Sequence, residues 1–377
     1  MGERSSRRVI VASDKFKGTL GSAEVAAFVG EGVRRVLPDA EVGCVPVADG
    51  GDGTLAAVVA AGFELGPVVA SGPTGEPVSS GFARRGGTAV VELADVCGLV
   101  RLPGGELAPM VASSRGVGEV MAAAIDSGCR RVILGIGGSA STDGGAGLLR
   151  ALGARVLDAR GDEVAEGGAG LLAAEVLDLT GLHSRLQRVE VVVACDVDNP
   201  LTGPAGAAAT YGHQKGASAT QVEQLDAALT HWADLVARTT GRDLRDSPGA
   251  GAAGGVGFAA IALLGAELRS GIELVLELVG FEQRVLGADL VVTGEGALDE
   301  QTLHGKAVAG VAAAARAAGV PVIAVCGTNR LEAAQLRSAG IGAAYALTDL
   351  EPDVRRCIAD PAPLLRQLGE RIAADLR

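Results

Sequence analysis

The stretch "RVIVASDKFKGTLGSAEVAAFVGEGVRRVLP", residues 8–38, decides the fold class of this chain. Its first six residues form an apolar, β-branched run of strand length. Ser22 stands where a helix N-cap is expected, and apolar residues then recur at helical spacing until Pro38 ends the helix. A second strand at 41–48 and a second helix starting near Asp52 repeat the order. This β-α-β-α order predicts a parallel sheet covered by helices.

The same order returns near the C-terminus. Strands are predicted at 288–296, 320–329 and 342–349, with helices at 302–318, at 331–338 and from about 353. The segment between the two ends differs, since it holds a hairpin-rich stretch at 75–93, a strand, glycine loop and helix at 130–153, a strand at 189–197 and a long helix near 218–240. We therefore predict an α/β fold in which residues 1–62 and 285–377 form one five-stranded domain. Residues 63–284 form a second, inserted domain.

The composition excludes several classes of partner. A net charge of −12 disfavours nucleic acid and anionic membrane surfaces. The N-terminus has no apolar region of signal-peptide length, and the uncharged run at 247–266 is too rich in Gly and Ala for lipid insertion, so we expect a glycine turn leading into a buried helix. The six cysteines show no C-x-x-C spacing, which indicates reduced thiols in a cytoplasmic protein.

Lysine is rare and oddly placed. Of 33 lysine and arginine residues only four are lysines, namely Lys15, Lys17, Lys215 and Lys306, and three of these adjoin a glycine. Lysine presents a compact ammonium that reaches a phosphate as a point charge, whereas arginine is a broad planar fork. We therefore expect these lysines to serve an anionic ligand.

Charged residues and glycines follow each strand of the split domain, and the carboxyl ends of parallel strands are where ligands bind. Asp and Gly also favour turns, so turn formation alone explains any single one of these loops. It does not explain the lysines. The candidate residues at this edge are Asp14, Lys15, Lys17, Asp49, Asp52, Glu295, Asp299 and Lys306.

The inserted domain carries its own glycine loop, "GIGGSASTDGGAG" at 135–147. Backbone N–H groups in such a loop, backed by a helix N-terminus, form an anion cradle. The candidate residues there are Gly137, Gly138, Ser139 and Asp143. The loop also fits a dinucleotide fingerprint, but that pattern alone is weak, so an NAD-dependent dehydrogenase ranks low. A Walker A loop around Lys306 fails because position 300 is Glu and position 307 is Ala.

Two further stretches of the inserted domain carry chemistry. Asp196 and Asp198 follow a buried strand and present two carboxylates for Mg²⁺, or one for the metal and one as a base; a turn before Pro200 is the alternative. Lys215 lies on a glycine loop beside His213. Lysines, glycine cradles and carboxylates together point to phosphoryl transfer, which needs positioning, charge neutralisation, Mg²⁺ and a base for the acceptor hydroxyl.

Seven motifs, in this order along nearly the whole chain, resemble the bacterial glycerate kinase family. They are "SDKFKGTL", "PVADGGDGT", "GIGGSASTDGGAG", "ACDVDNPLTG", "YGHQKGA", "GAAGGVGF" and "TGEGALDEQTLHGKA". The resemblance implies a flavodoxin-like domain with an inserted α/β domain. It also implies ATP-dependent phosphorylation of D-glycerate, most often at the 2-hydroxyl, in organic acid catabolism.

The expected ligands are therefore D-glycerate, ATP and Mg²⁺, in a cytoplasmic enzyme for which a homodimer stays open. We assign catalytic roles to Asp196, Lys15, Lys17 and Lys306, a metal role to Asp198, and substrate or phosphate binding to the other candidates, Lys215 included. The alternatives are a kinase that forms 3-phosphoglycerate and a non-catalytic module that binds nucleotides or phosphosugars. The number of carboxylates at the strand ends favours an enzyme.

Overall fold

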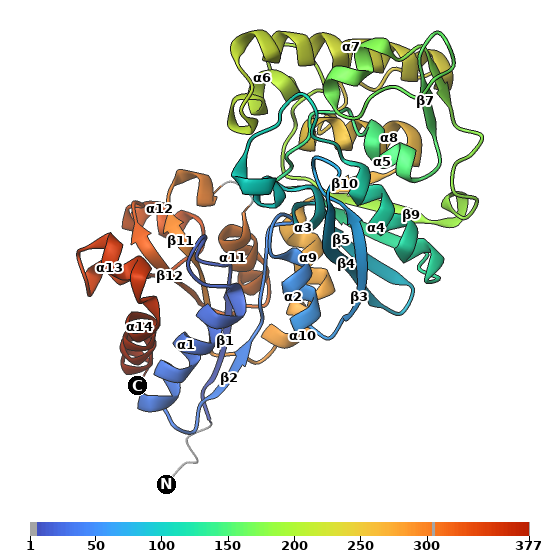
Figure 1. Cartoon of the computed structure of the whole chain (residues 1–377). Helices are drawn as coiled ribbons and strands as arrows, with labels where there is room; N and C mark the ends of the chain where they lie inside the picture. The colour runs from blue at the N-terminus through green and yellow to red at the C-terminus, as the bar shows by residue number, and fades with distance from the viewer. Residues whose placement is uncertain (1–5, 304–305, 377) are drawn as a thin grey trace. The chain divides into compact units, whose positions relative to one another are not determined.

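The computed structural model describes residues 6–303 and 306–376. Contacts group the chain into two compact units, and Figure 1 shows the blue N-terminal and red C-terminal segments in the same one. Unit 1 comprises Met1–Asp49, Ala56–Gly62 and Ile272–Arg377, and unit 2 comprises Gly50–Leu55 and Phe63–Gly271. The domain boundaries at 62/63 and 284/285 stay a prediction.

Unit 1 contains a five-stranded sheet whose strands are all parallel, in the order β13-β12-β11-β1-β2. Numbered along the unit, this is the 2-1-3-4-5 order of flavodoxin-like folds, so the predicted fold class is confirmed. The strands are β1 (Arg8–Ser13), β2 (Glu41–Cys44), β11 (Leu290–Leu298), β12 (Val322–Asn329) and β13 (Ala344–Ala346).

Side chains of β1 alternate between two hydrophobic cores. Val9 and Val11 pack on one face with α1 (Ser22–Val36) and α14 (Pro361–Asp375), and Ile10 and Ala12 pack on the other with α11 (Ala307–Ala317). A strand buried on both faces is continuously apolar, as the RVIVAS run is. The continuous apolar run therefore fits a strand that has a neighbour on each side, β11 and β2, in a sheet covered on both faces.

Two local expectations for unit 1 were wrong. Gly21, not Ser22, is the N-cap of α1, and the Ser22 hydroxyl instead donates to the Ser13 carbonyl and accepts from the Val47 N–H. β12 ends at Asn329, as predicted, but β11 runs past its predicted end at 296, because Ala297 and Leu298 keep pairing with Thr328 and Asn329 of β12. Glu295 therefore lies within a strand and not in the loop after it.

Unit 2 contains a six-stranded mixed sheet in the order β10-β9-β6-β5-β4-β3. β3, β4 and β5 are antiparallel, which confirms the predicted hairpin, and β5, β6, β9 and β10 are parallel. The strands are β3 (Glu64–Ser71), β4 (Pro77–Arg85), β5 (Thr88–Glu92), β6 (Arg131–Gly135), β9 (Glu190–Ala194) and β10 (Glu267–Arg269), with a separate pair, β7 (Arg155–Leu157) and β8 (Val176–Asp178).

The helices of unit 2 surround one core that includes the fully buried Trp232. The long predicted helix is α7 (Ala219–Thr240), whose Ser218 N-cap accepts from the Gln221 N–H. The others are α3 (Leu93–Cys97), α4 (Arg115–Asp126), α5 (Ala146–Ala151), α6 (Ala207–Tyr211) and α8 (Val256–Leu264). The rest of the chain adds α2 (Thr54–Ala60), α9 (Gly271–Leu278), α10 (Phe281–Val285), α12 (Ala333–Ser338) and α13 (Val354–Ala359).

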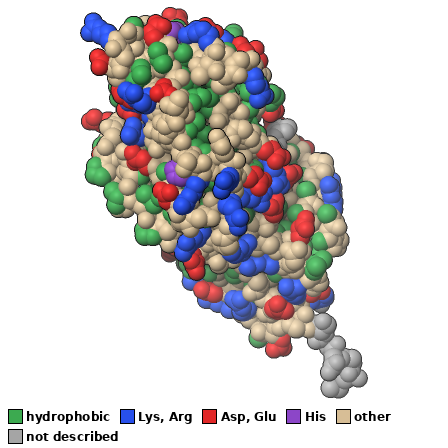
Figure 2. All heavy atoms as spheres, turned by 90° about the vertical axis from the view of Figure 1, so that its right-hand side faces the viewer, with side chains coloured by type: hydrophobic (Ala, Val, Ile, Leu, Met, Phe, Trp, Pro, Cys, Tyr) green, Lys and Arg blue, Asp and Glu red, His purple; other side chains and the backbone are tan. Residues whose placement is uncertain are grey.

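The uncharged run at 247–266 forms a glycine turn followed by the largely buried α8, as predicted. Over the described ranges, no helix has both the length and the apolar character needed to cross a membrane. On the face shown in Figure 2, Lys and Arg side chains gather near the middle of the view with Asp and Glu side chains beside them.

Candidate active site

In unit 1 the sheet brings three carboxylates close enough to interact at its carboxyl edge. Asp14 follows β1, and the negative charges of Asp49 and Glu295 repel that of its carboxylate. Burial, followed by repulsion from Asp49, raises the pKa of Asp14 to about 7, although the Lys15 backbone N–H donates to its Oδ1 at 2.7 Å. A carboxyl with a pKa near neutrality, held among other acids, is characteristic of functional sites.

The lysines of unit 1 lie at the same edge in different settings. Lys15 is half-buried, Lys17 is exposed, and Lys306 is the N-cap of α11 with its Nζ 3.1 Å from Oε1 of Gln301. Burial raises the pKa of Glu295, while a hydrogen bond from Thr302 and the charge of Lys306 lower it. These cations can therefore approach the acids of the edge.

The remaining candidates of this edge are placed differently. Asp299 closes a short turn, since its Oδ1 accepts from the Gln301 N–H at 2.9 Å and its own N–H donates to Thr302 Oγ1 at 3.0 Å. Asp52 belongs to unit 2 and is exposed. His304, which precedes Lys306 by two residues and was a further candidate for that reason, lies outside the described residues.

In unit 2 two glycine segments meet backbone to backbone. A Cβ on Gly135 would lie 2.5 Å from the Gly50 carbonyl oxygen, and one on Gly137 would lie 2.7 Å from the Gly51 Cα. No side chain fits at such distances, so glycine is required at both positions. The segment 50–53 is therefore fixed against the glycine loop that follows β6.

Glu92, the last residue of β5, holds that segment from the other side, and it was missed by sequence reasoning. Its Oε1 accepts from the Gly53 N–H at 3.0 Å and its Oε2 from the Leu55 N–H at 2.7 Å. It is only 4% exposed, and burial raises its pKa to about 7, although these two hydrogen bonds lower it. The one signal in the sequence is a charged residue that ends the apolar run TAVVE.

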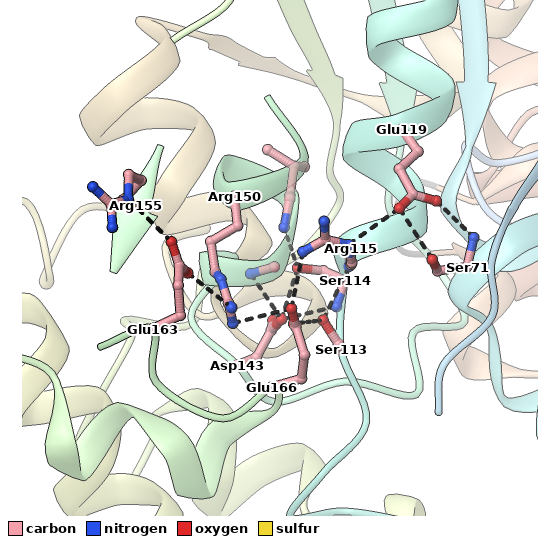
Figure 3. A network of polar contacts seen from close by, with 12 residues as sticks. Ser71, Ser113, Ser114, Arg115, Glu119, Asp143, Arg150, Arg155, Glu163 and Glu166 are labelled. Atoms are coloured by element: carbon pink, nitrogen blue, oxygen red, sulfur yellow. Dashed lines mark hydrogen bonds and ion pairs between the residues drawn. The ribbon is translucent and has the colours of Figure 1, made fainter. Parts of the chain in front are cut away.

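Asp143 organises the glycine loop from within (Figure 3). Its fully buried carboxylate accepts from the N–H and the hydroxyl of Ser114, both at 2.8 Å, and from the N–H groups of Gly145 and Gly147 at 3.1 and 3.2 Å. Burial nevertheless raises the pKa of Asp143. These two loop amides are therefore directed at Asp143, and the outward part of the loop is at Gly137 and the exposed Gly138.

Two other candidates also point inward. The Ser139 hydroxyl contacts Ser141, and the Lys215 ammonium donates to the Ser141 carbonyl. Lys215 is 3% exposed, and burial lowers its pKa to about 8 while Asp143 opposes that change. Lys215 and Asp143 are thus both buried beneath the loop, and the charge of Asp143 acts on the Lys215 ammonium.

Asp196 and Asp198 lie on the loop after β9, and both are exposed. Oδ1 of Asp196 accepts from the Gly271 N–H at 3.0 Å. Asn199 fixes the loop that follows, because its Nδ2 donates to the Ala205 carbonyl at 2.8 Å and its Oδ1 accepts from the Tyr211 hydroxyl at 2.6 Å. In the part of the chain that the structure covers, no group of three or more His, Cys, Asp or Glu residues could by itself hold a metal ion.

A chain of ion pairs between Arg115 and Arg155 was also missed (Figure 3). Arg115 donates to Glu119 and Glu166, Arg150 to Glu166 and Glu163, and Arg155 to Glu163. Its members come from α4, α5, β7 and the segment 163–166. Arg115 and Glu119 are an i,i+4 pair within α4, but the contacts that join Arg115 and Arg150 to Glu166 depend on folding of distant segments.

The fold and the chemistry together define a class. A flavodoxin-like sheet with lysines and a carboxyl of near-neutral pKa at its ligand-binding edge, joined to an α/β unit with a glycine loop, is equipped for phosphoryl transfer between small molecules.

Comparison with known proteins identifies the member of that class. The model of the glycerate kinase family matches residues 9–377. Glycerate kinase of Bacillus subtilis is 43% identical over 373 residues, 98% of each chain, and glycerate 2-kinase of Escherichia coli is 43% identical over 344 residues, 90% of each. A crystal structure assigned to glycerate kinase 2 of Salmonella typhimurium LT2 superposes with a TM-score of 0.85 at 40% identity, covering 98% of both chains.

The chain therefore belongs to the glycerate kinase family. The predictions of this family and of a kinase are confirmed, and membership of a kinase family implies ATP as the phosphate donor.

Proposed function

We propose that the enzyme transfers the γ-phosphoryl group of ATP to the 2-hydroxyl of D-glycerate, which yields 2-phosphoglycerate and ADP. The observation that carries this proposal is similarity over at least nine-tenths of the chain to enzymes named glycerate kinase, one of which is named glycerate 2-kinase.

In this proposal Lys15, Lys17 and Lys306 neutralise the phosphates of ATP at the edge of unit 1. All three lie at or next to the carboxyl ends of the strands, and the placement of Lys306 at the N-terminus of α11 adds a helix dipole to its charge. Asp14, Asp49, Glu295 and Asp299 shape the same edge. The near-neutral pKa of Asp14 lets it hold a proton there at physiological pH.

In unit 2, the glycine loop is proposed to bind phosphate through its outward part, at Gly137 and Gly138. Asp143, Ser139 and Lys215 support it from inside, so their contribution to phosphate binding passes through the loop. Asp52 stands beside this loop on the segment that Glu92 holds.

Asp196 is proposed as the base. The 2-hydroxyl oxygen bonds to the γ-phosphorus, the bond from that phosphorus to the bridging oxygen of ADP breaks, and the hydroxyl proton passes to a carboxylate oxygen of Asp196. The hydrogen bond from the Gly271 N–H orients this carboxylate.

Asp198 fits a magnesium role by its chemistry. Mg²⁺ is commonly held by one or two carboxylates together with substrate phosphates, and Asp198 is an exposed carboxylate on a fixed loop. When bound there, the ion would neutralise charge on the transferred phosphate. The chain's own part is to hold Asp198 in place through Asn199 and its contacts to Ala205 and Tyr211.

The 2-hydroxyl is proposed because it lies one bond from the carbon that carries the carboxylate. A site that grips the carboxylate controls the position of the nearest hydroxyl best. Transfer to the 3-hydroxyl, which would form 3-phosphoglycerate, is the competing outcome.

The test couples the reaction to enolase and pyruvate kinase without phosphoglycerate mutase. Only the 2-phosphate feeds enolase directly, so we expect pyruvate to form in step with ADP. ADP release without pyruvate would contradict the position of transfer, and absence of glycerate-dependent ADP release would contradict the substrate.

We also propose that the enzyme acts in the cytoplasm, in organic acid catabolism. The need for ATP and the presence of six free thiols support this setting. A homodimer is compatible with it, and sedimentation of the purified protein would decide the oligomeric state.

A further inference from the structure

A pocket of about 190 Å³ opens in unit 2 beside the ion-pair network of Figure 3. Its walls are the segment 71–75 between β3 and β4, together with Val111, Ser113, Arg115 and Glu166. This volume suits a ligand of a few heavy atoms and is far smaller than a nucleotide site requires.

The pocket lies at the ligand-binding edge of the sheet of unit 2. Segment 71–75 connects the end of β3 to the start of β4, and β4 is antiparallel to β5, so this turn is on the side where β5 and β6 end. Arg115 begins α4, whose N-terminus is at the same side. Carboxyl ends of parallel strands are the usual place of substrate sites in α/β folds.

Arg115 is held rigidly in this pocket. Its Nε donates to Oε1 of Glu119 at 3.2 Å, and its Nη1 donates to Oε1 of Glu166 at 3.1 Å. Within the described part of the chain, Nη2 of Arg115 makes no hydrogen bond, and the side chain is 39% exposed. An arginine fixed on two sides with one side open is pre-organised to bind a further carboxylate.

Glu119 and Glu166 leave Arg115 able to bind a further carboxylate, because the oxygens of both glutamates also accept hydrogen bonds from other groups. Glu119 also accepts from the N–H and hydroxyl of Ser71, at 2.7 and 3.0 Å. Glu166 also accepts from the Ser113 hydroxyl at 2.7 Å and pairs with Arg150 at 3.0 Å. Charge-assisted hydrogen bonds of this kind hold both carboxylates in place and offset their charge.

The hydroxyl groups of the pocket complement an alcohol. Ser71 and Thr74 each donate their hydroxyl proton to a glutamate, which leaves their oxygens to act as acceptors toward a ligand. A ligand that offers a carboxylate to Arg115 and hydroxyl protons to these oxygens matches both sets of groups. That combination describes a small hydroxy acid.

We propose that this pocket is the subsite for the carboxylate of the acid substrate, with Nη2 of Arg115 as its anchor. The inference rests on the proposed function, because it names where the acceptor of that reaction is gripped. In this proposal Arg115 binds the carboxylate of the acid, and the lysines of unit 1 bind the phosphates of ATP.

The test measures D-glycerate binding by calorimetry, separately from turnover, in Arg115→Met and in the control Arg155→Met. Arg155 belongs to the same network but, among the residues that the structure describes, pairs only with Glu163, and it is 55% exposed. Loss of a charge-assisted hydrogen-bonded contact should weaken D-glycerate binding roughly 10- to 100-fold in Arg115→Met, with KM for ATP unchanged. Arg155→Met should bind like the unaltered enzyme. Glycerol, which lacks the carboxylate, should bind the unaltered enzyme and Arg115→Met equally weakly.

A second variant avoids the ion pairs altogether. Val111 is 53% exposed, so Val111→Trp should fold and fill the pocket, and it should also weaken D-glycerate binding at least 10-fold. Unchanged binding in both Arg115→Met and Val111→Trp would overturn the subsite. If binding falls as expected but the unaltered enzyme releases no ADP with D-glycerate, the subsite stands and the proposed function fails.

Discussion

The four lysines of this chain illustrate what rarity can and cannot predict for a residue. Their scarcity indicated special positions, and each does lie at a strand end, a helix start or beneath a glycine loop. Rarity could not distinguish Lys215, which is buried under its loop, from Lys17, which is exposed. That distinction depends on packing between segments far apart in the sequence.

The unit 1 lysines are expected to resist replacement even by arginine. Lys15→Arg, Lys17→Arg and Lys306→Arg should each lower kcat/KM, by up to the roughly 2–4 kcal/mol, or about 30- to 10³-fold, that loss of one well-placed donor costs. The control is Arg35→Lys, an exposed pair with Glu370, which should leave kcat/KM unchanged. Steady-state kinetics of folded variants decide the matter, and unchanged values at all three lysines would refute their role.

The two exposed aspartates after β9 give a second residue-level prediction. Asp196→Asn and Asp198→Asn should lower turnover at least 100-fold while the unfolding midpoint moves little, because an amide keeps the size but accepts no proton and neutralises no metal. Rapid-quench assays and thermal melts measure the two effects. Full activity in both variants would show that neither aspartate is the base, and Asp14 would then be the next candidate.

Glu92 links a single residue to the pH dependence of stability. Its folded pKa of about 7 exceeds the ordinary 4.5, so the stability it contributes is present below pH 4.5 and is lost as pH rises through 7. Glu92→Gln should therefore gain stability relative to the unaltered protein between pH 5 and pH 8, on the order of 2 kcal/mol. Urea unfolding at both pH values tests this, with the exposed Glu64→Gln as control. A difference that does not change with pH would contradict it.

At the scale of elements, the hydrophobic periodicity correctly predicted the helices and strands whose formation depends on residues close together in the sequence. Helices such as α7 and the strands β1 and β6 appear where their patterns indicated. The end of β11 was missed because this strand extends by pairing with β12, a contact that the local sequence does not show. Glu92 was missed because its partners, Gly53 and Leu55, are 39 and 37 residues away.

The glycine loop supplies the prediction that belongs to this scale. Gly137→Ala would place a Cβ 2.7 Å from the Gly51 Cα and push the two glycine segments apart. We expect an increase of KM for ATP of at least 10-fold. Gly87→Ala is the matched control, because a Cβ there meets nothing within 4 Å. Equal kinetics in the two variants would show that the contact between the loops does not matter for function.

At the scale of the molecule, the repeated β-α pattern predicted a parallel five-stranded sheet, and the resemblance added the flavodoxin-like fold; the order of the strands was not predicted from the pattern. The interior of the candidate site was harder to predict from the sequence. Asp143 and Lys215 were rightly singled out, but only the structure shows that both support the glycine loop from inside. Arg115 and Glu166 are 51 residues apart, so no local pattern indicated their pairing.

The central claim is that this enzyme phosphorylates D-glycerate at its 2-hydroxyl. A proton-coupled ³¹P spectrum of the products formed from ATP and D-glycerate tests it most directly. A phosphate on C2 couples to the single proton of that carbon, so the account predicts a new doublet beside the signals of ADP. A triplet, from coupling to the two protons of C3, would contradict the position of transfer, and the absence of any new phosphate ester would contradict the reaction itself.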